Sequence, residues 1–353
     1  MITRTPFLTT LPVDGSFRYQ NTLQILPPKS EDPSPPFMMG WYGGTLAVSF
    51  EESVADVRTT DYWVHDHRER IRFNLLKSKA NDETWLNAAI QDMSMNRRLG
   101  IEKEALNLLQ VISNNIFRKP SSSHAWFLDP ETKKATYGQL WYPSFVTDNP
   151  GYFLENTEKE IQLVDAHTHY SRLGIGKEDT AITLPSNIDA LLDAYFNLSS
   201  HRKINFERAC NLFRSAQKVW STSKSLALAA HVFAIDALCH VDDPKPVKCP
   251  ECQNLLSDQT CSECGGPKFG ITRRFRDFVS QFVDDSEEER FSKRMFQIRS
   301  AIAHQGDLLR MDEYGTEFNV GGTDAQHNYS YGVAKTTRKV LVGWLASTQT
   351  ESN

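Results

Sequence analysis

The chain has no long continuous apolar run. Its longest apolar-rich stretch, Leu226–Val241, contains His231, Asp236 and His240 and is shorter than the ~20 residues that a membrane span needs. Residues 1–11 also lack the continuous apolar stretch typical of a secretion signal. We therefore expect a cytoplasmic protein that does not insert into a membrane.

The sequence also lacks a strong excess of either charge. A formal net charge of −5 argues against a surface that binds nucleic acid over its whole extent, because dedicated binders usually carry a clear basic excess. Basic residues gather only locally, and they predict a small basic cleft rather than a basic face. The clusters are Arg273, Arg274 and Arg276; Lys293, Arg294 and Arg299; and Lys335, Arg338 and Lys339.

Length and hydrophobic periodicity predict an α+β protein of two domains, because 353 residues exceed the usual domain size of about 100–200. Residues 1–180 have the mixed pattern of an α/β domain, and residues 184–350 have the pattern of an all-α helical bundle. We place the boundary between Leu173 and Leu184. The predicted strands are Phe17–Leu26, Thr45–Phe50, Ile71–Leu75 and Ala135–Val146; helical patterns occur near Glu83–Met95 and Glu102–Ile116; the bundle helices are Ser186–Leu198, Asn205–Val219, Lys224–Val241, Thr272–Val283, Glu287–Ala303 and one near Tyr331–Ala346.

Cysteine is scarce, and four of the six cysteines form two Cys-x-x-Cys pairs. Eight residues separate the two pairs, and two glycines, which allow tight turns, follow the second pair. The predicted metal ligands are Cys249, Cys252, Cys261 and Cys264. Four thiolates complete the tetrahedral shell of a structural zinc and leave no open position for catalysis. We therefore predict a zinc ribbon at residues 246–268, inserted between two bundle helices, and no catalytic metal. Cys210 and Cys239 lie in apolar helical contexts and are expected to be buried thiols.

A late helix carries the most informative motif. Acidic residues in the first turn, an apolar stripe from Phe291 to Ile302 and a stop at Gly306 define it, and near its end stands Arg299-Ser-Ala-Ile-Ala-His304. The helix ends in the sequence FQIRSAIAHQG. In this sequence and over about residues 184–350, the chain resembles the HEPN superfamily, particularly its Apea-like branch. That signature is an arginine, four to six residues, and a histidine on a late bundle helix. Ser300 departs from the Asn, Asp or His that often follows the family's arginine.

The resemblance implies a function as well as a fold. Members are commonly metal-independent endoribonucleases that act as homodimers, which would make Arg299, His304 and Asp236 catalytic and RNA the substrate. The buried helix that holds Asp236 lies where the family carries an acidic residue. By this resemblance we expect RNA cleavage by 2′-OH transesterification, in phage defence or toxin-like RNA degradation. The N-terminal domain would sense a trigger, receive a regulatory partner or position the substrate.

The motif leaves two alternatives open. Positions i and i+5 lie roughly 140° apart around a helix, so Arg299 and His304 do not share a face. His304 could serve only as a charge at the helix C-terminus, with Arg299 as the structural partner of Asp236. The chain would then be a noncatalytic HEPN module that binds RNA, a nucleotide or a protein. The spacing alone is weak evidence, because the pairs Arg58–His65 and Arg118–His124 also fit it.

A second motif, Val164-Asp-Ala-His-Thr-His169, resembles the His-x-His of metal-dependent amidohydrolases. On a strand, His167 and His169 would share one face. Such enzymes need most of a barrel of about 250 residues, whereas only 184 residues follow His169 and these have helical patterns. The pair His65 and His67 is better explained as the exposed polar face of a strand. We therefore expect no metal hydrolase.

Overall fold

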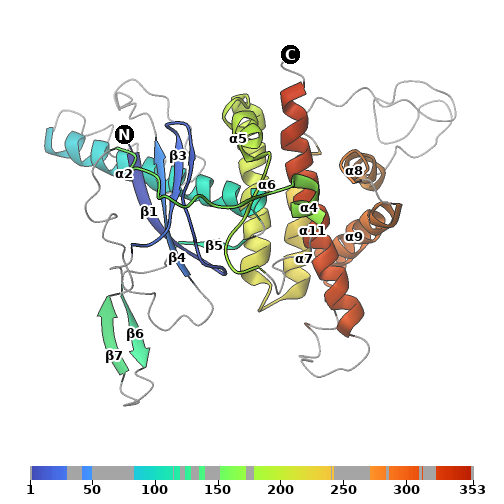
Figure 1. Cartoon of the computed structure of the whole chain (residues 1–353). Coiled ribbons are helices and arrows are strands. Elements are labelled where there is room, and N and C mark those ends of the chain that lie inside the picture. Colours follow the sequence, from blue (N-terminus) through green and yellow to red (C-terminus); the bar gives the residue numbers. More distant parts are fainter. Residues whose placement is uncertain are drawn as a thin grey trace, which may run out of the picture. The chain divides into compact units, whose positions relative to one another are not determined.

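The computed structural model describes residues 2–29, 42–49, 83–113, 115–119, 124–128, 135–139, 152–171, 179–239, 241, 271–283, 286–309, 312 and 323–350. Helices and an antiparallel sheet are both present, which confirms the α+β class (Figure 1). The chain divides into a first unit, residues 1–106 with 118–160, and a second unit, residues 107–117 with 161–353. The division after Glu160 comes earlier than the expected boundary. The reason is that β8 (Leu163–Val164) pairs in parallel with β9 (Leu184–Pro185) in the second unit.

The sheet is built around two long antiparallel strands, β1 (Ile2–Thr9) and β4 (Tyr42–Ser49). A hairpin of β2 (Phe17–Tyr19) and β3 (Leu23–Leu26) extends it beside β4, and the short β5 (Phe117–Arg118) follows β1, in the order β2-β3-β4-β1-β5. A separate hairpin joins β6 (His124–Leu128) to β7 (Ala135–Gln139). The predicted strand Ile71–Leu75 lies outside the described residues.

Both faces of β1 are covered, which explains why nearly the whole strand is buried. Successive side chains of a strand point to opposite faces. On one face, the hydroxyl of Thr3 accordingly donates a hydrogen bond to the carboxylate of Glu102 in helix α2 (Glu83–Ile112). On the other face, the guanidinium of Arg4 donates to the carbonyl of Tyr152. Gln24 of β3 lies on the same row as Arg4, through Ala47, and bonds the backbone of Leu154. The sheet is therefore enclosed between α2 and the segment 152–156.

The second unit is a group of helices around α7 (Lys224–Asp236). This helix packs against α6 (Ser200–Val219), α9 (Ser286–Gln305) and α11 (Thr323–Thr350) (Figure 1). Its sequence KSLALAAHVFAID is apolar almost all round, as a central helix requires, and its alanines allow close approach of the neighbouring helices. The described residues of this unit also form α4 (Ala166–Ser171), α5 (Ile188–Phe196), α8 (Ile271–Val279) and the C-terminal end of α2.

Candidate functional site on the helical unit

Arg299 of α9 lies against the C-terminal end of α7. Its Nη2 donates to Oδ2 of Asp236 over 3.2 Å, and the side chains of the two residues are only 17% and 18% exposed. The guanidinium also lies over the rings of Phe233 and Phe296, 4.6 and 5.4 Å from their centroids. The contact between Asp236 and Arg299 that the sequence analysis considered is therefore present. Burial of Asp236 is substantial but incomplete.

Further charge surrounds this pair. The thiol of Cys239 is buried, as the sequence predicted for both unpaired cysteines. Burial and the nearby Asp236 carboxylate raise the pKa of the Cys239 thiol, and Arg274 of α8 opposes that rise. Arg274 and Asp236 thus both act on one group at the end of α7.

His304 is exposed in the last turn of α9. Gly306 follows in the left-handed conformation, with φ of +75°, and the backbone N–H of Asp307 donates to the carbonyl of Ala301 over 3.3 Å, so the helix ends immediately after the motif. Within the described part of the chain, no hydrogen bond or ion pair joins His304 to Arg299 or Asp236. One chain therefore brings together the arginine and the acid, but not the histidine.

Asp312 was missed by the sequence analysis. Its carboxylate accepts hydrogen bonds at the N-terminus of α7, from the side chain of Ser223 and the backbone N–H groups of Lys224 and Ser225. Burial raises the pKa of Asp312, but the hydrogen bonds from these residues outweigh it and the net shift is downward. No local pattern could have indicated this contact, because Asp312 and Ser223 are far apart in the sequence.

His231, Phe213 and Arg338 form a buried cluster inside the same unit. His231 of α7 contacts the ring of Phe213, with centroids 5.1 Å apart, and Arg338 of α11 lies over that ring at 5.4 Å. Burial and the charge of Arg338 lower the pKa of His231 to about 3. His231 is therefore neutral at physiological pH and belongs to the core. Among the predicted basic residues, Arg338 is thus inside the bundle and cannot contribute to a surface cleft.

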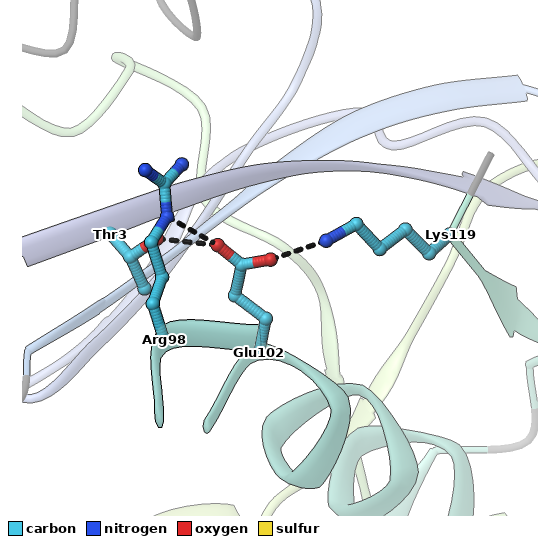
Figure 2. Close-up of polar contacts among 4 residues, drawn as sticks. All are labelled: Thr3, Arg98, Glu102 and Lys119. Atoms are coloured by element: carbon cyan, nitrogen blue, oxygen red, sulfur yellow. Dashed lines mark hydrogen bonds and ion pairs between the residues drawn. The ribbon is translucent and has the colours of Figure 1, made fainter. Parts of the chain in front are cut away.

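The first unit contains a polar cluster around Glu102, shown in Figure 2. Its carboxylate accepts from Thr3 at 2.5 Å and pairs with Arg98 at 3.1 Å and Lys119 at 2.5 Å. Burial raises the pKa of Glu102, but the bonds from Lys119, Thr3 and Arg98 lower it further than burial raises it. A carboxylate held ionised by three donors is suited to joining β1, α2 and the chain beyond β5, not to proton transfer.

The rejected metal motif does not form a strand. His167 and His169 lie on the short helix α4, where the side chain of His169 is buried and that of His167 is exposed. Residues two apart on a helix point in different directions, so this pair cannot chelate one ion. In the described part of the chain, no cluster of three or more His, Cys, Asp or Glu side chains could hold a metal. The four predicted zinc ligands and the pair His65 and His67 lie outside the described residues.

One surface hollow lies away from the motif. It has a volume of about 620 Å³ and is lined by residues of α5, the start of α6 and the end of α11, including Asp193 and Arg202. Neither Arg299, His304 nor Asp236 lines it. None of the described helices is long and apolar enough to cross a membrane.

Comparison of the chain with protein-family models, with curated proteins and with solved structures gave no match.

Proposed function

We propose that this protein is a metal-independent HEPN-type endoribonuclease, which cleaves RNA through Arg299 and His304. The observation that carries the proposal is the ion pair between Arg299 and Asp236. It joins the motif arginine of a late helix to the acid of a central helix, which is the acid that the family resemblance singles out. The alternative pair Arg118 and His124 has less support, because both residues lie in strands, and the pair Arg58 and His65 lies outside the described residues.

The proposed reaction is attack of the ribose 2′-oxygen on the adjacent phosphorus. It requires a base for the 2′-proton, a donor for the leaving 5′-oxygen and positive charge beside the five-coordinate phosphate. His304 is exposed, and an imidazole side chain is suited to proton transfer. Arg299 is suited to the phosphate, because a guanidinium has five N–H donors and the bond to Asp236 uses one of them. The products would end in 2′,3′-cyclic phosphate and 5′-hydroxyl.

The active unit in this proposal is a homodimer. The reaction uses a base and an acid, whereas one chain supplies one motif histidine, which does not contact its own Arg299. A two-fold axis beside α9 would bring two copies of the same surface together and place both histidines around one phosphate. Arg294 is exposed on α9 and would be doubled near the cleft. This local charge would attract RNA despite the net charge of −5.

Three further parts of the proposal come from the sequence. The four ribbon cysteines hold one structural zinc that joins the ends of two bundle helices. The first unit senses a trigger, binds a regulatory partner or positions RNA. The protein acts in the cytoplasm, in antiviral defence or as a toxin-like nuclease, as the resemblance suggests.

A noncatalytic HEPN module is the second candidate function. It is favoured by the packing of Arg299, which lies against Asp236 and two phenylalanine rings as a structural arginine would. In that case the bundle would bind RNA, a nucleotide or a protein without cleaving RNA, and His304 would only stabilise the end of α9.

The two functions are separated by incubating the purified protein with single-stranded RNA in EDTA and analysing the fragment ends. The nuclease should release fragments ending in 2′,3′-cyclic phosphate, and His304→Ala should release none. His201→Ala is the matched control, because His201 is also an exposed histidine on a bundle helix and should leave cleavage unchanged. RNA that is bound but left intact by the wild-type protein would support the noncatalytic module.

A further inference from the structure

The chain that follows His304 returns to the start of α7. After Gly306 turns the backbone out of α9, the N–H of Leu309 donates to Oγ of Ser225 over 2.7 Å. Ser225 is buried in the first turn of α7, so water cannot easily replace this bond. The exit from α9 is therefore attached to the interior of the bundle within five residues of His304.

Asp312 makes a second and stronger attachment. Its Oδ2 accepts from Oγ of Ser223 at 2.8 Å and from the N–H of Ser225 at 2.7 Å, and its Oδ1 accepts from the N–H of Lys224 at 2.8 Å. A carboxylate is a favoured acceptor at a helix N-terminus, where backbone N–H groups lack partners within the helix and the helix dipole is positive. Bonds to a charged acceptor are also among the stronger hydrogen bonds in proteins.

Helix α7 consequently holds α9 and its exit at two places. Asp236, at the C-terminal end of α7, pairs with Arg299 before His304. Ser225 and Asp312 join the N-terminal end of α7 to the chain after His304. The intervening turn, which carries His304, would otherwise be an exposed helix end, the part of a helix most prone to fraying.

We infer that Asp312 is a positioning residue, which fixes the exit of α9 on the start of α7 and thereby holds His304 in place for proton transfer. The inference rests on the proposed nuclease function. In this role Asp312 does not contact RNA and acts only through the position of His304. Accurate placement matters because a displacement of about 1 Å in an active site can cost a factor of about 100 in rate.

The test compares Asp312→Ala with Asp307→Ala in the full-length protein. Asp307 is exposed and lies in the same segment after α9, but its side chain makes no described contact with α7. The substitution Asp307→Ala removes the same charge as Asp312→Ala. We expect Asp312→Ala to lower kcat for RNA cleavage by about 10- to 100-fold, while KM changes less than about twofold. Asp307→Ala should keep kcat within about twofold of the wild type.

A second readout does not depend on activity. The imidazole Cε1–Hε1 signal of His304, assigned by its loss in His304→Gln, reports the surroundings of this side chain in NMR spectra. Asp312→Ala should broaden or split the His304 signal, while the signal of the core residue His231 keeps its position. A single, sharp His304 signal at the position seen in the wild type, together with unchanged kcat, would overturn the inference.

Ser225→Ala covers the case in which Asp312→Ala does not fold. It removes the acceptor for the Leu309 N–H without changing charge, and should broaden the same His304 signal and lower kcat several-fold. A wild-type His304 signal in a folded Ser225→Ala protein would then overturn the inference. If the wild-type protein cleaves no RNA, the proposed function fails, whereas the His304 spectra still decide whether Asp312 positions this side chain.

Discussion

Removal of the Asp236 carboxylate should destabilise the helical unit by about 2–3 kcal/mol. Exposed ion pairs contribute about 0–1 kcal/mol, whereas breaking a fully buried pair costs about 3–5 kcal/mol. The pair with Arg299 lies between these limits, because the two side chains are 17% and 18% exposed. A hydrogen bond to a charged group, worth about 1.5–3 kcal/mol, gives a range that includes this value.

Hydrogen exchange at the amides of α7 is the appropriate assay, because it reports on this helix alone, whereas a single melting temperature of a chain with two compact units need not describe one two-state transition. Asp236→Ala should increase exchange throughout α7 and α9. In a thermal scan, the loss corresponds to a shift of roughly 4–12 °C for a unit of this size, at about 2–4 °C per kcal/mol.

A double-mutant cycle supplies the control. Arg299→Met removes the charge but keeps an apolar chain of similar length, and the double variant gives the coupling energy of the pair. Arg299→Ala should cost more than Asp236→Ala, because it also removes the contacts with the rings of Phe233 and Phe296. A loss below about 0.5 kcal/mol in Asp236→Ala, or a coupling energy near zero, would refute this account of the pair.

Freshly purified protein should contain one zinc per chain by elemental analysis, and Cys252→Ser should lower zinc content, solubility and melting temperature; folded protein without zinc would contradict the ribbon. Stability should fall with decreasing pH, because the folded-state pKa of His231, about 3, lies below the ordinary value of 6.5. The unfolded state then binds the extra proton between about pH 6.5 and 3, and urea unfolding of His231→Gln should lose this part of the pH dependence. An unchanged pH profile in that variant would show that His231 is not held neutral. Mixing His304→Ala chains with wild-type chains should lower activity more than dilution does, whereas a fully active monomer in sedimentation would exclude the shared site.

Periodicity was sufficient to predict most of the helical unit. The predicted helix Lys224–Val241 corresponds to α7 and Glu287–Ala303 to α9, because apolar spacing and end signals are local properties of the sequence. Strand β1 was missed, because Thr3, Arg4 and Thr5 look like an exposed polar segment. Their burial depends on partners distant in the sequence, Glu102 for Thr3 and Tyr152 for Arg4.

Helix α2 shows the opposite failure. The sequence predicted two helical patterns, near Glu83–Met95 and Glu102–Ile116, yet α2 continues from Glu83 to Ile112 through Gly100. Glycine costs about 1 kcal/mol within a helix, which packing and the Glu102 cluster can offset. A contact of Asp236 with Arg299 or another cation of the bundle was predicted, because a lone acid in an apolar helix needs a cation, and Arg299 makes that contact. The three hydrogen bonds that Asp312 accepts at the start of α7 could not be predicted, because no sequence rule identifies an acceptor that lies so many residues away from the helix.

The most direct test of the proposed nuclease uses one RNA oligonucleotide in two forms. Once a scission site is known, a single 2′-deoxy nucleotide replaces the ribonucleotide on its 5′ side, and both forms are incubated with wild-type and His304→Ala protein in EDTA. Transesterification requires the 2′-hydroxyl. We predict that wild-type protein cleaves only the all-ribose form at that site, leaving a 2′,3′-cyclic phosphate, and that His304→Ala cleaves neither form. Cleavage of the deoxy-substituted form at the same position, or an active His304→Ala protein cleared of contaminating nuclease, would contradict the account.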